Sequence, residues 1–204
     1  MKTLVRLTMG TALVALAALW QTAPAQAGGN VDVFAGQKEV DTNFGEGHDM
    51  QEQDALALLT DWGGDNWPVH IAVDMLTGNK DVNGDDFNPD IDGSTGEFDV
   101  GVRWYPAKGS HWMPHLGGGV GLISGKVRVN NEDPNDPNDD FGFDDSKLGY
   151  WADTGLAYRM GDHFKLGGRV RYSAAKFDNV TGPGGTEEVD AGGVAYGVNA
   201  GWTW

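Results

Sequence analysis

The 204-residue sequence contains no cysteine, and basic residues are scarce. Without cysteine the chain has no disulfide, no thiolate metal site and no lipid attachment through a thiol. The 14 Lys and Arg residues face 30 Asp and Glu residues, which gives a formal net charge of -16. Nucleic-acid binding depends on cationic side chains that contact phosphates. We therefore expect neither thiol chemistry nor a nucleic-acid partner.

Long apolar runs are missing too, except at the N-terminus. Met9 to Trp20 is almost wholly apolar, two basic residues precede it, and Ala25-Gln26-Ala27 follows it. This arrangement is typical of a secretory signal peptide, and the run is shorter than the roughly 20 residues of a spanning helix. A transmembrane anchor is the less favoured alternative. We expect residues 1–27 to be a cleaved signal peptide and residues 28–204 to form one domain.

The rest of the chain shows apolar and polar residues in alternation. At the C-terminus the even positions are Val194, Tyr196, Val198, Ala200, Trp202 and Trp204, and the odd positions are small or polar. A period of two predicts a strand with one apolar face. Seven upstream segments alternate in the same way, with these residues on the apolar face: Val31, Val33 and Ala35; Leu56, Leu58, Thr60 and Trp62; Trp67, Val69, Ile71, Val73 and Met75; Phe98, Val100, Val102 and Trp104; Pro114, Leu116, Val120 and Leu122; Tyr150, Ala152, Leu156 and Tyr158; Phe164, Leu166, Val170 and Tyr172. The sequence therefore predicts eight strands and no helix after residue 27.

The connections between these segments alternate in length. The short ones are 63–66, 106–111 and 161–163, and the long ones are 40–53, 78–93, 130–146 and 176–190. Short turns at one end and long loops at the other are the pattern of a transmembrane β-barrel. The tryptophans next to the short turns or the C-terminus are Trp62, Trp67, Trp104, Trp112, Trp202 and Trp204. They predict an aromatic girdle at one membrane interface. The alternative is a set of core tryptophans in a soluble protein.

Together these features resemble the small eight-stranded outer-membrane β-barrel proteins, the class of the OmpA membrane domain and the OmpX-like proteins. Most members end in Phe, whereas this chain ends in Trp204. The resemblance implies an all-β, eight-stranded antiparallel up-and-down transmembrane β-barrel in a Gram-negative outer membrane. It also implies extracellular loops, periplasmic mature termini and a monomer. The partners that it implies are outer-membrane lipids, lipopolysaccharide and the barrel-assembly machinery, which reads the C-terminal strand.

Charged residues occupy the predicted inward face. They are Asp74, Glu97, Asp99, Arg103, Asp153, Arg159, Lys165, Arg169 and Arg171. Buried charges need partners, because desolvating a lone ion costs several kcal/mol. An eight-stranded barrel is narrow enough for side chains to fill. We expect an ion-pair network in the lumen, with Gly117, Gly119 and Gly121 leaving room for the large side chains opposite. The alternative is a narrow, porin-like ion channel.

The long loops hold most of the acidic residues. Carboxylates suited to hard cations include Asp81, Asp85, Asp90, Asp92, Asp133, Asp136, Asp139 and Asp140. We expect no specific metal site and no cofactor, but loose calcium or magnesium binding stays open beside a purely solvated acidic loop. The strong acidity also fits a high-salt habitat.

We find no catalytic residues, because no nucleophile–base grouping is predicted. A lipid-modifying enzyme centred on His48 is the remaining enzymatic alternative. The resemblance to the small outer-membrane barrels implies a non-enzymatic surface protein that acts in envelope integrity or surface interaction.

Overall fold

The computed structural model describes residues 27–40, 52–64, 67–82, 90–107, 110–130, 141–182, 185–190 and 192–204. The predicted signal peptide, apart from its last residue, lies outside these ranges and stays a prediction. The strands are β1 (Ala27–Val40), β2 (Glu52–Gly64), β3 (Val69–Val82), β4 (Asp90–Trp104), β5 (Trp112–Asn130), β6 (Phe141–Met160), β7 (Phe164–Ala174), β8 (Lys176–Gly182), β9 (Gly185–Asp190) and β10 (Gly193–Thr203). The described residues form no helix long and apolar enough to cross a membrane.

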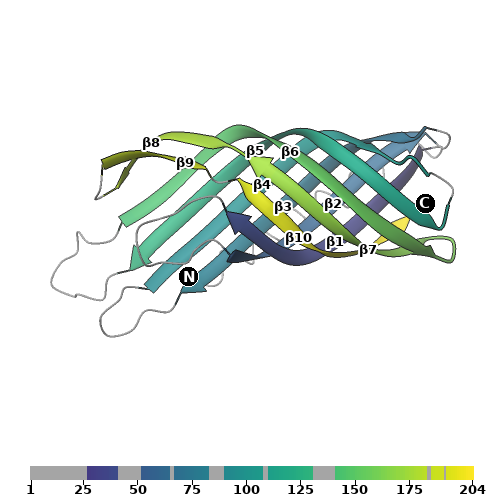
Figure 1. The fold of residues 1–204 in the computed structure, drawn as a ribbon, viewed down its shortest axis with the longest axis horizontal. Helices are drawn as coiled ribbons and strands as arrows, with labels where there is room; N and C mark the ends of the chain where they lie inside the picture. Colours follow the sequence, from purple (N-terminus) through teal and green to yellow (C-terminus); the bar gives the residue numbers. More distant parts are fainter. Residues whose placement is uncertain are drawn as a thin grey trace.

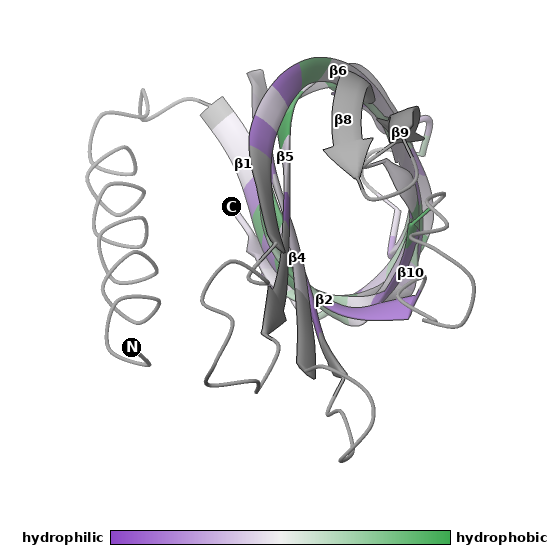
Figure 2. Cartoon of the chain, turned by 90° about the vertical axis from the view of Figure 1, so that its left-hand side faces the viewer, coloured by the Kyte–Doolittle hydropathy of each residue, from purple (hydrophilic) through white to green (hydrophobic). Residues whose placement is uncertain are grey.

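Eight of the strands close into a barrel in the order β1-β10-β7-β6-β5-β4-β3-β2, with every neighbouring pair antiparallel (Figure 1). The seam joins β1 to β10, from Asn30 opposite Thr203 to Val40 opposite Gly193. Viewed along its axis the wall is a closed ring, and hydrophilic and hydrophobic residues alternate along it (Figure 2). The predicted eight-stranded antiparallel barrel is thus confirmed.

The two faces of the wall differ as the period of two requires. On β4, Val100 is 44% exposed on the outside, whereas Arg103 is 0% exposed on the inside. The apolar outer face of β7 extends from Phe164 to Tyr172. At a rise of ~3.3 Å per residue and a tilt of ~40°, this stretch gives a band about 20–25 Å tall. That height matches the apolar band of an outer-membrane barrel. The large apolar side chains on the outside would contact lipid there.

One residue of the predicted outer face is buried. Thr60 of β2 is fully buried, and its hydroxyl donates to the Val73 carbonyl oxygen at 2.5 Å. A short hydroxyl side chain bonds most readily to nearby backbone, so Thr60 folds against the neighbouring strand instead of extending outward.

The strands extend further at the long-loop end than the sequence predicts. β3 continues to Val82, β4 begins at Asp90, and β6 begins at Phe141. The segment read as a fourth long loop contains β8 and β9, which pair with each other outside the barrel. These segments carry Asp, Asn and Gly instead of an apolar alternation, because above an apolar band both faces of a strand are free of lipid contact. The composition of these segments therefore predicted loops, although their backbone forms strands.

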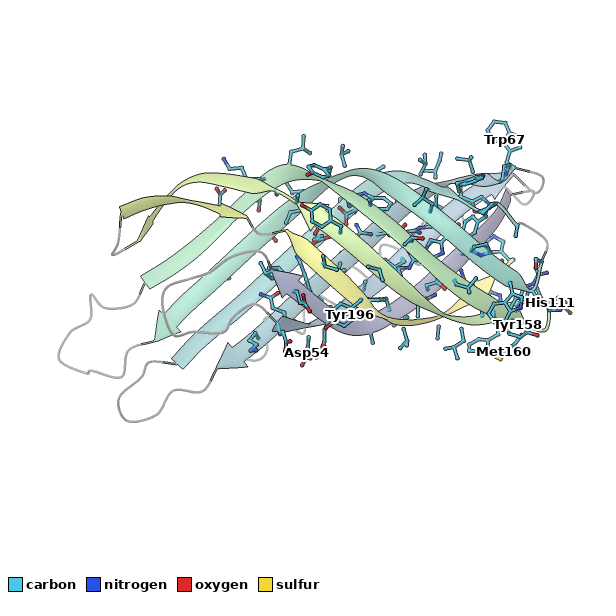
Figure 3. All side chains as sticks on the ribbon, viewed as in Figure 1. Asp54, Trp67, His111, Tyr158, Met160 and Tyr196 are labelled. Carbon is cyan, nitrogen blue, oxygen red and sulfur yellow. The ribbon has the colours of Figure 1, made fainter. Side chains whose placement is uncertain are left out.

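The six predicted girdle tryptophans all lie at the end of the barrel that carries the short turns. Trp67 is 70% exposed and points away from the wall, and His111 and Tyr158 lie at the same end (Figure 3). Tyr158 packs edge-on against Trp112, with ring centroids 4.9 Å apart. His163 stacks on Trp202 at the same centroid distance, and its Nδ1 donates to the Thr203 carbonyl oxygen at 2.9 Å. The short-turn rim is therefore a belt of amphipathic rings.

Candidate functional site

The inward-facing side chains of the barrel form the candidate site. Eight of the nine predicted lumen residues take part in ion pairs, namely Asp74, Glu97, Asp99, Arg103, Asp153, Lys165, Arg169 and Arg171. The ninth, Arg159, is half-buried in β6 near the short-turn rim, and its backbone NH donates to the His111 carbonyl oxygen at 2.7 Å. The alternation of each strand thus gathers most of the predicted charges in one interior.

Arg103 of β4 lies at the centre of the network. Its Nη2 is 2.5 Å from Asp74 Oδ2 and 3.0 Å from Asp153 Oδ2. Its Nη1 is 3.3 Å from Asp61 Oδ2. One guanidinium therefore joins carboxylates from β2, β3 and β6. The fork of five N–H donors makes arginine suited to this role.

Arg171 of β7 holds a second group of carboxylates. Asp74 and Asp99 are direct cross-strand neighbours on β3 and β4, a like-charge arrangement that is destabilising by itself. Arg171 bridges the two, with Nη1 3.0 Å from Asp74 Oδ2 and Nη2 bonded to Asp99 Oδ2. Its Nε lies 3.4 Å from Glu97 Oε2. The Trp151 ring packs against this guanidinium, 4.4 Å from Cζ to the ring centroid, in a cation–π contact.

The remaining cations of β7 join it to β1 and β6. Arg169 Nη1 is 2.5 Å from Asp153 Oδ2, and its Nη2 is 3.6 Å from Asp32 Oδ2. Lys165 Nζ donates to the same Asp32 oxygen at 2.9 Å. Because β7 and β1 flank β10, these contacts cross the closing seam from the inside.

Towards the long-loop end the network ends on Lys38 of β1. Its Nζ donates to Glu97 Oε1 at 2.8 Å, and Thr95 Oγ1 lies 3.4 Å away. Ser173 Oγ donates to the same Glu97 oxygen at 2.6 Å. Lys38 is fully buried, so its charge is stabilised by the Glu97 carboxylate and not by water.

Towards the short-turn end the lumen closes on Asp61. Asn30 Nδ2 donates to Asp61 Oδ1 at 2.7 Å, and His70 Nδ1 lies 2.6 Å from the same oxygen. The Tyr105 hydroxyl donates to Asp61 Oδ2 at 2.7 Å. The His115 ring follows, with its centroid 5.9 Å from that of Tyr105. His70, Tyr105 and His115 are all buried, so this cluster packs inside the barrel near the turns.

Glycines make room for the carboxylates. Three aspartates each lie directly opposite a glycine of the neighbouring strand: Asp32 opposite Gly201, Asp99 opposite Gly121, and Asp153 opposite Gly117. In each pair a Cβ on the glycine would collide with Oδ1 of the aspartate. Oδ1 therefore lies in the space that a glycine Cβ would occupy, while Oδ2 faces the cations. Gly119 instead allows the β4 backbone to approach closely. A Cβ added at Gly119 would collide with the Val100 carbonyl oxygen.

Sequence reasoning missed several members of the network. Asp32 and Lys38 alternate with the outward Val33, Ala35 and Gln37, so the period of β1 contained the signal for both. Asp61 lies beside Trp62 in one of the two weaker predicted strands. Tyr105 follows the last residue of β4, and it continues the inward alternation of Asp99 and Arg103, so the period contained the signal for it as well.

Among the described residues, the lumen contains six buried carboxylates and five buried Lys or Arg side chains, so these charges nearly balance. Within the described ranges, no group of three His, Cys, Asp or Glu side chains is placed to hold a metal ion. The described His–Asp pair, His70 with Asp61, is buried inside the network. The arrangement is suited to filling and rigidifying a barrel.

The predicted cation-binding carboxylates are not gathered into a site that can be described. Asp85, Asp133, Asp136, Asp139 and Asp140 lie outside the described residues, as does His48. The backbones of Asp81, Asp90 and Asp92 belong to β3 and β4, where Asp81 is opposite Asp92. Loose cation binding by these residues stays a prediction.

No protein-family model and no curated protein sequence matches this chain. Solved structures match its fold. Ail, the attachment invasion locus protein of Yersinia pestis, solved with the heparin analogue sucrose octasulfate, has a TM-score of 0.59 at 14% identity, covering 88% of this chain and 99% of that one. Neisserial surface protein A has a TM-score of 0.52 at 12% identity, covering 88% and 96%. The outer membrane protein OprG from Pseudomonas aeruginosa has a TM-score of 0.51 at 17% identity, also covering 88% and 96%. The chain thus has the fold of the small outer-membrane β-barrels, as its sequence predicted.

Proposed function

We propose that this chain is a non-enzymatic β-barrel protein of a bacterial outer membrane that acts in envelope integrity or surface interaction. Its lumen is closed by paired charges, and its acidic loops are the working surface. The observation that carries the proposal is the network centred on Arg103 and Arg171, which links carboxylates from four strands across the lumen. A barrel filled in this way acts as a rigid support and not as a pore.

The outer surface supports insertion of the barrel in a bilayer. Large apolar side chains stay exposed along the wall, from Val33 on β1 to Val198 on β10. In a soluble protein such a surface would be buried or would drive association. The aromatic rim next to the short turns matches the girdle of a membrane interface. We place this rim and both mature termini on the periplasmic side, with the long loops outside.

The acidic loops determine which partners are suitable. Ail was solved with a polyanion, the heparin analogue named above. The charged residues in the loops of this chain are mostly Asp and Glu, so the loops repel polyanions and attract cations. Calcium or magnesium, held loosely, would bridge these carboxylates to the phosphates of outer-membrane lipids and lipopolysaccharide. Assembly would use the C-terminal strand as the signal to the barrel-assembly machinery, and the protein would act as a monomer.

Single-channel conductance in a planar bilayer, with and without calcium, tests the closed lumen. We expect no steps from protein that is shown to be folded by its heat-shifted gel mobility. The matched variant is Arg103→Ala with Arg171→Ala, which removes the two guanidiniums that pack on Trp151. This variant should conduct if it folds. Stable ohmic steps from the unsubstituted protein would refute the closed lumen and favour the narrow channel, whose selectivity the inward arginines would set.

A further inference from the structure

The hairpin of β8 and β9 continues the hairpin of β7 and β10 in the same register. Ser173 of β7 is opposite Gly193 of β10, and Lys176 of β8 is opposite Asp190 of β9. Between these two pairs both strands advance by the same number of residues, so no residue is inserted on either side of the break. Among the described residues the interruption includes Ala175 and Gly192. The hairpin therefore leaves the barrel without slipping in register, and its own register shifts only further along, between Phe177 and Val180.

The break has a backbone cause on the β10 side. Gly193 has a φ of 140°, a conformation that residues with a Cβ rarely adopt. A Cβ at Gly193 would also collide with the Glu39 carbonyl oxygen of β1. β8 and β9 form a separate two-stranded sheet that extends past the barrel at the end opposite the C-terminus (Figure 1). The glycine thus marks a hinge between the barrel and this hairpin.

β6 offers a strand edge beside the hinge. It pairs with β7 only from Tyr150, opposite Ala174, towards the short-turn end. Its earlier part, Phe141–Gly149, has a ladder to β5 on one side, and the described pairings give it no ladder on the other. An open edge of this length carries a row of backbone donors and acceptors that can pair with another strand.

The first step of such a pairing is already present in the structure. An ideal Cβ on Gly149 would lie 3.0 Å from the Ala175 Cβ, so the two residues are in close approach. Gly149 opposite Ala175 is the position that follows Tyr150 opposite Ala174 in the same register. β8 also contacts β6 directly. The edge and the strand that could occupy it therefore meet at the hinge.

We propose that the edge Phe141–Gly149 of β6 is a docking site for β8 of the same chain. When the hinge straightens, β8 continues β7 and pairs with β6 in the β6–β7 register, which places Leu148 opposite Lys176 and Lys147 opposite Phe177. The β8–β9 hairpin then lengthens the barrel wall at the long-loop end. When the hinge bends, the edge is open. The inference does not depend on the proposed function of the loops.

Cysteine cross-linking tests the register, because the chain has no cysteine of its own. Leu148→Cys with Lys176→Cys places both thiols on facing positions of the docked strands, before the register shift of β8. The matched positive control is Ala152→Cys with Tyr172→Cys, an observed cross-strand pair on the exposed outer face. The out-of-register control is Leu148→Cys with Phe177→Cys, since adjacent residues of a regular strand point to opposite faces.

Each variant is refolded, checked by heat-shifted gel mobility, oxidised under mild conditions and run on a gel with and without reductant. We expect the in-register pair to form an intramolecular disulfide to an extent within about twofold of the positive control. The out-of-register pair should form at least about tenfold less. Equal yields for the two Leu148 pairs, or no yield for either while the control oxidises, would overturn docking. Intermolecular disulfides in its place would assign the edge to a second copy and overturn the proposal equally.

Discussion

Replacing Arg103 by methionine tests the paired lumen most directly. The substitution keeps much of the side-chain volume and removes the guanidinium that contacts Asp61, Asp74 and Asp153. Removing one partner of a buried ion pair typically costs about 3–5 kcal/mol, because the other charge stays buried. Asp74 keeps Arg171, and Asp153 keeps Arg169. We therefore expect a loss near the lower limit, about 3 kcal/mol.

The assay is reversible urea unfolding in lipid vesicles, followed by tryptophan fluorescence and by heat-shifted gel mobility. With a slope of roughly 1–3 kcal/mol per M of urea, the midpoint should fall by roughly 1–3 M. Arg103→Lys keeps the positive charge but loses the forked guanidinium. Its urea midpoint should therefore lie between those of the unsubstituted protein and Arg103→Met. A cycle with Asp74→Asn should show a coupling of about 1 kcal/mol or more. If Arg103→Met stays within about 0.5 kcal/mol of the unsubstituted protein, the lumen charges are hydrated and the paired-lumen account is wrong.

Two further substitutions test the glycine packing and the membrane band. Gly121→Ala pushes a methyl group into Asp99 and should lower the unfolding free energy by about 1–3 kcal/mol, as overpacking does. The control is Gly168→Ala, because a Cβ there would meet nothing nearer than 3.8 Å, and it should change the unfolding free energy by less than about 0.5 kcal/mol. Equal losses for the two variants in urea unfolding would contradict the close fit of Asp99 against Gly121. Val100→Arg, in the middle of the band, should cost about 2–4 kcal/mol in vesicles. The same change at Ser94, nearer the long-loop end, should cost at most about 1 kcal/mol, and a cost independent of position would argue against the membrane placement.

The sequence predicted the parts of the fold in which a strand has one face towards lipid and the other towards the lumen. In such strands the period of two is imposed by the surroundings, so Val100 and Val102 point out while Asp99 and Arg103 point in. Beyond the band this constraint ends. The first residues of β6, and all of β8 and β9, therefore read as loop from composition although the backbone is extended.

The candidate site could be predicted by residue but not by partner. The alternation identified Asp153 and Arg169 as inward, but it did not specify that they would be 2.5 Å apart. It also passed over Asp32 and Lys38, because the apolar face of β1 is short and the signal weak. Thr60 was predicted to be exposed on the outer face. It is buried because its hydroxyl donates to a backbone carbonyl oxygen of the neighbouring strand.

The amino-acid sequence by itself determined the orientation of the strands, because a side-chain period of two and an apolar surrounding leave one consistent assignment of faces. It also determined the end of the barrel at which the tryptophans lie, since they flank the short turns. Only the tertiary structure decided which charges meet. Lys165 and Asp32 are 133 residues apart in the chain and 2.9 Å apart in the lumen. Closure of the barrel and the stagger between its strands bring them together, and neither is encoded in a local pattern.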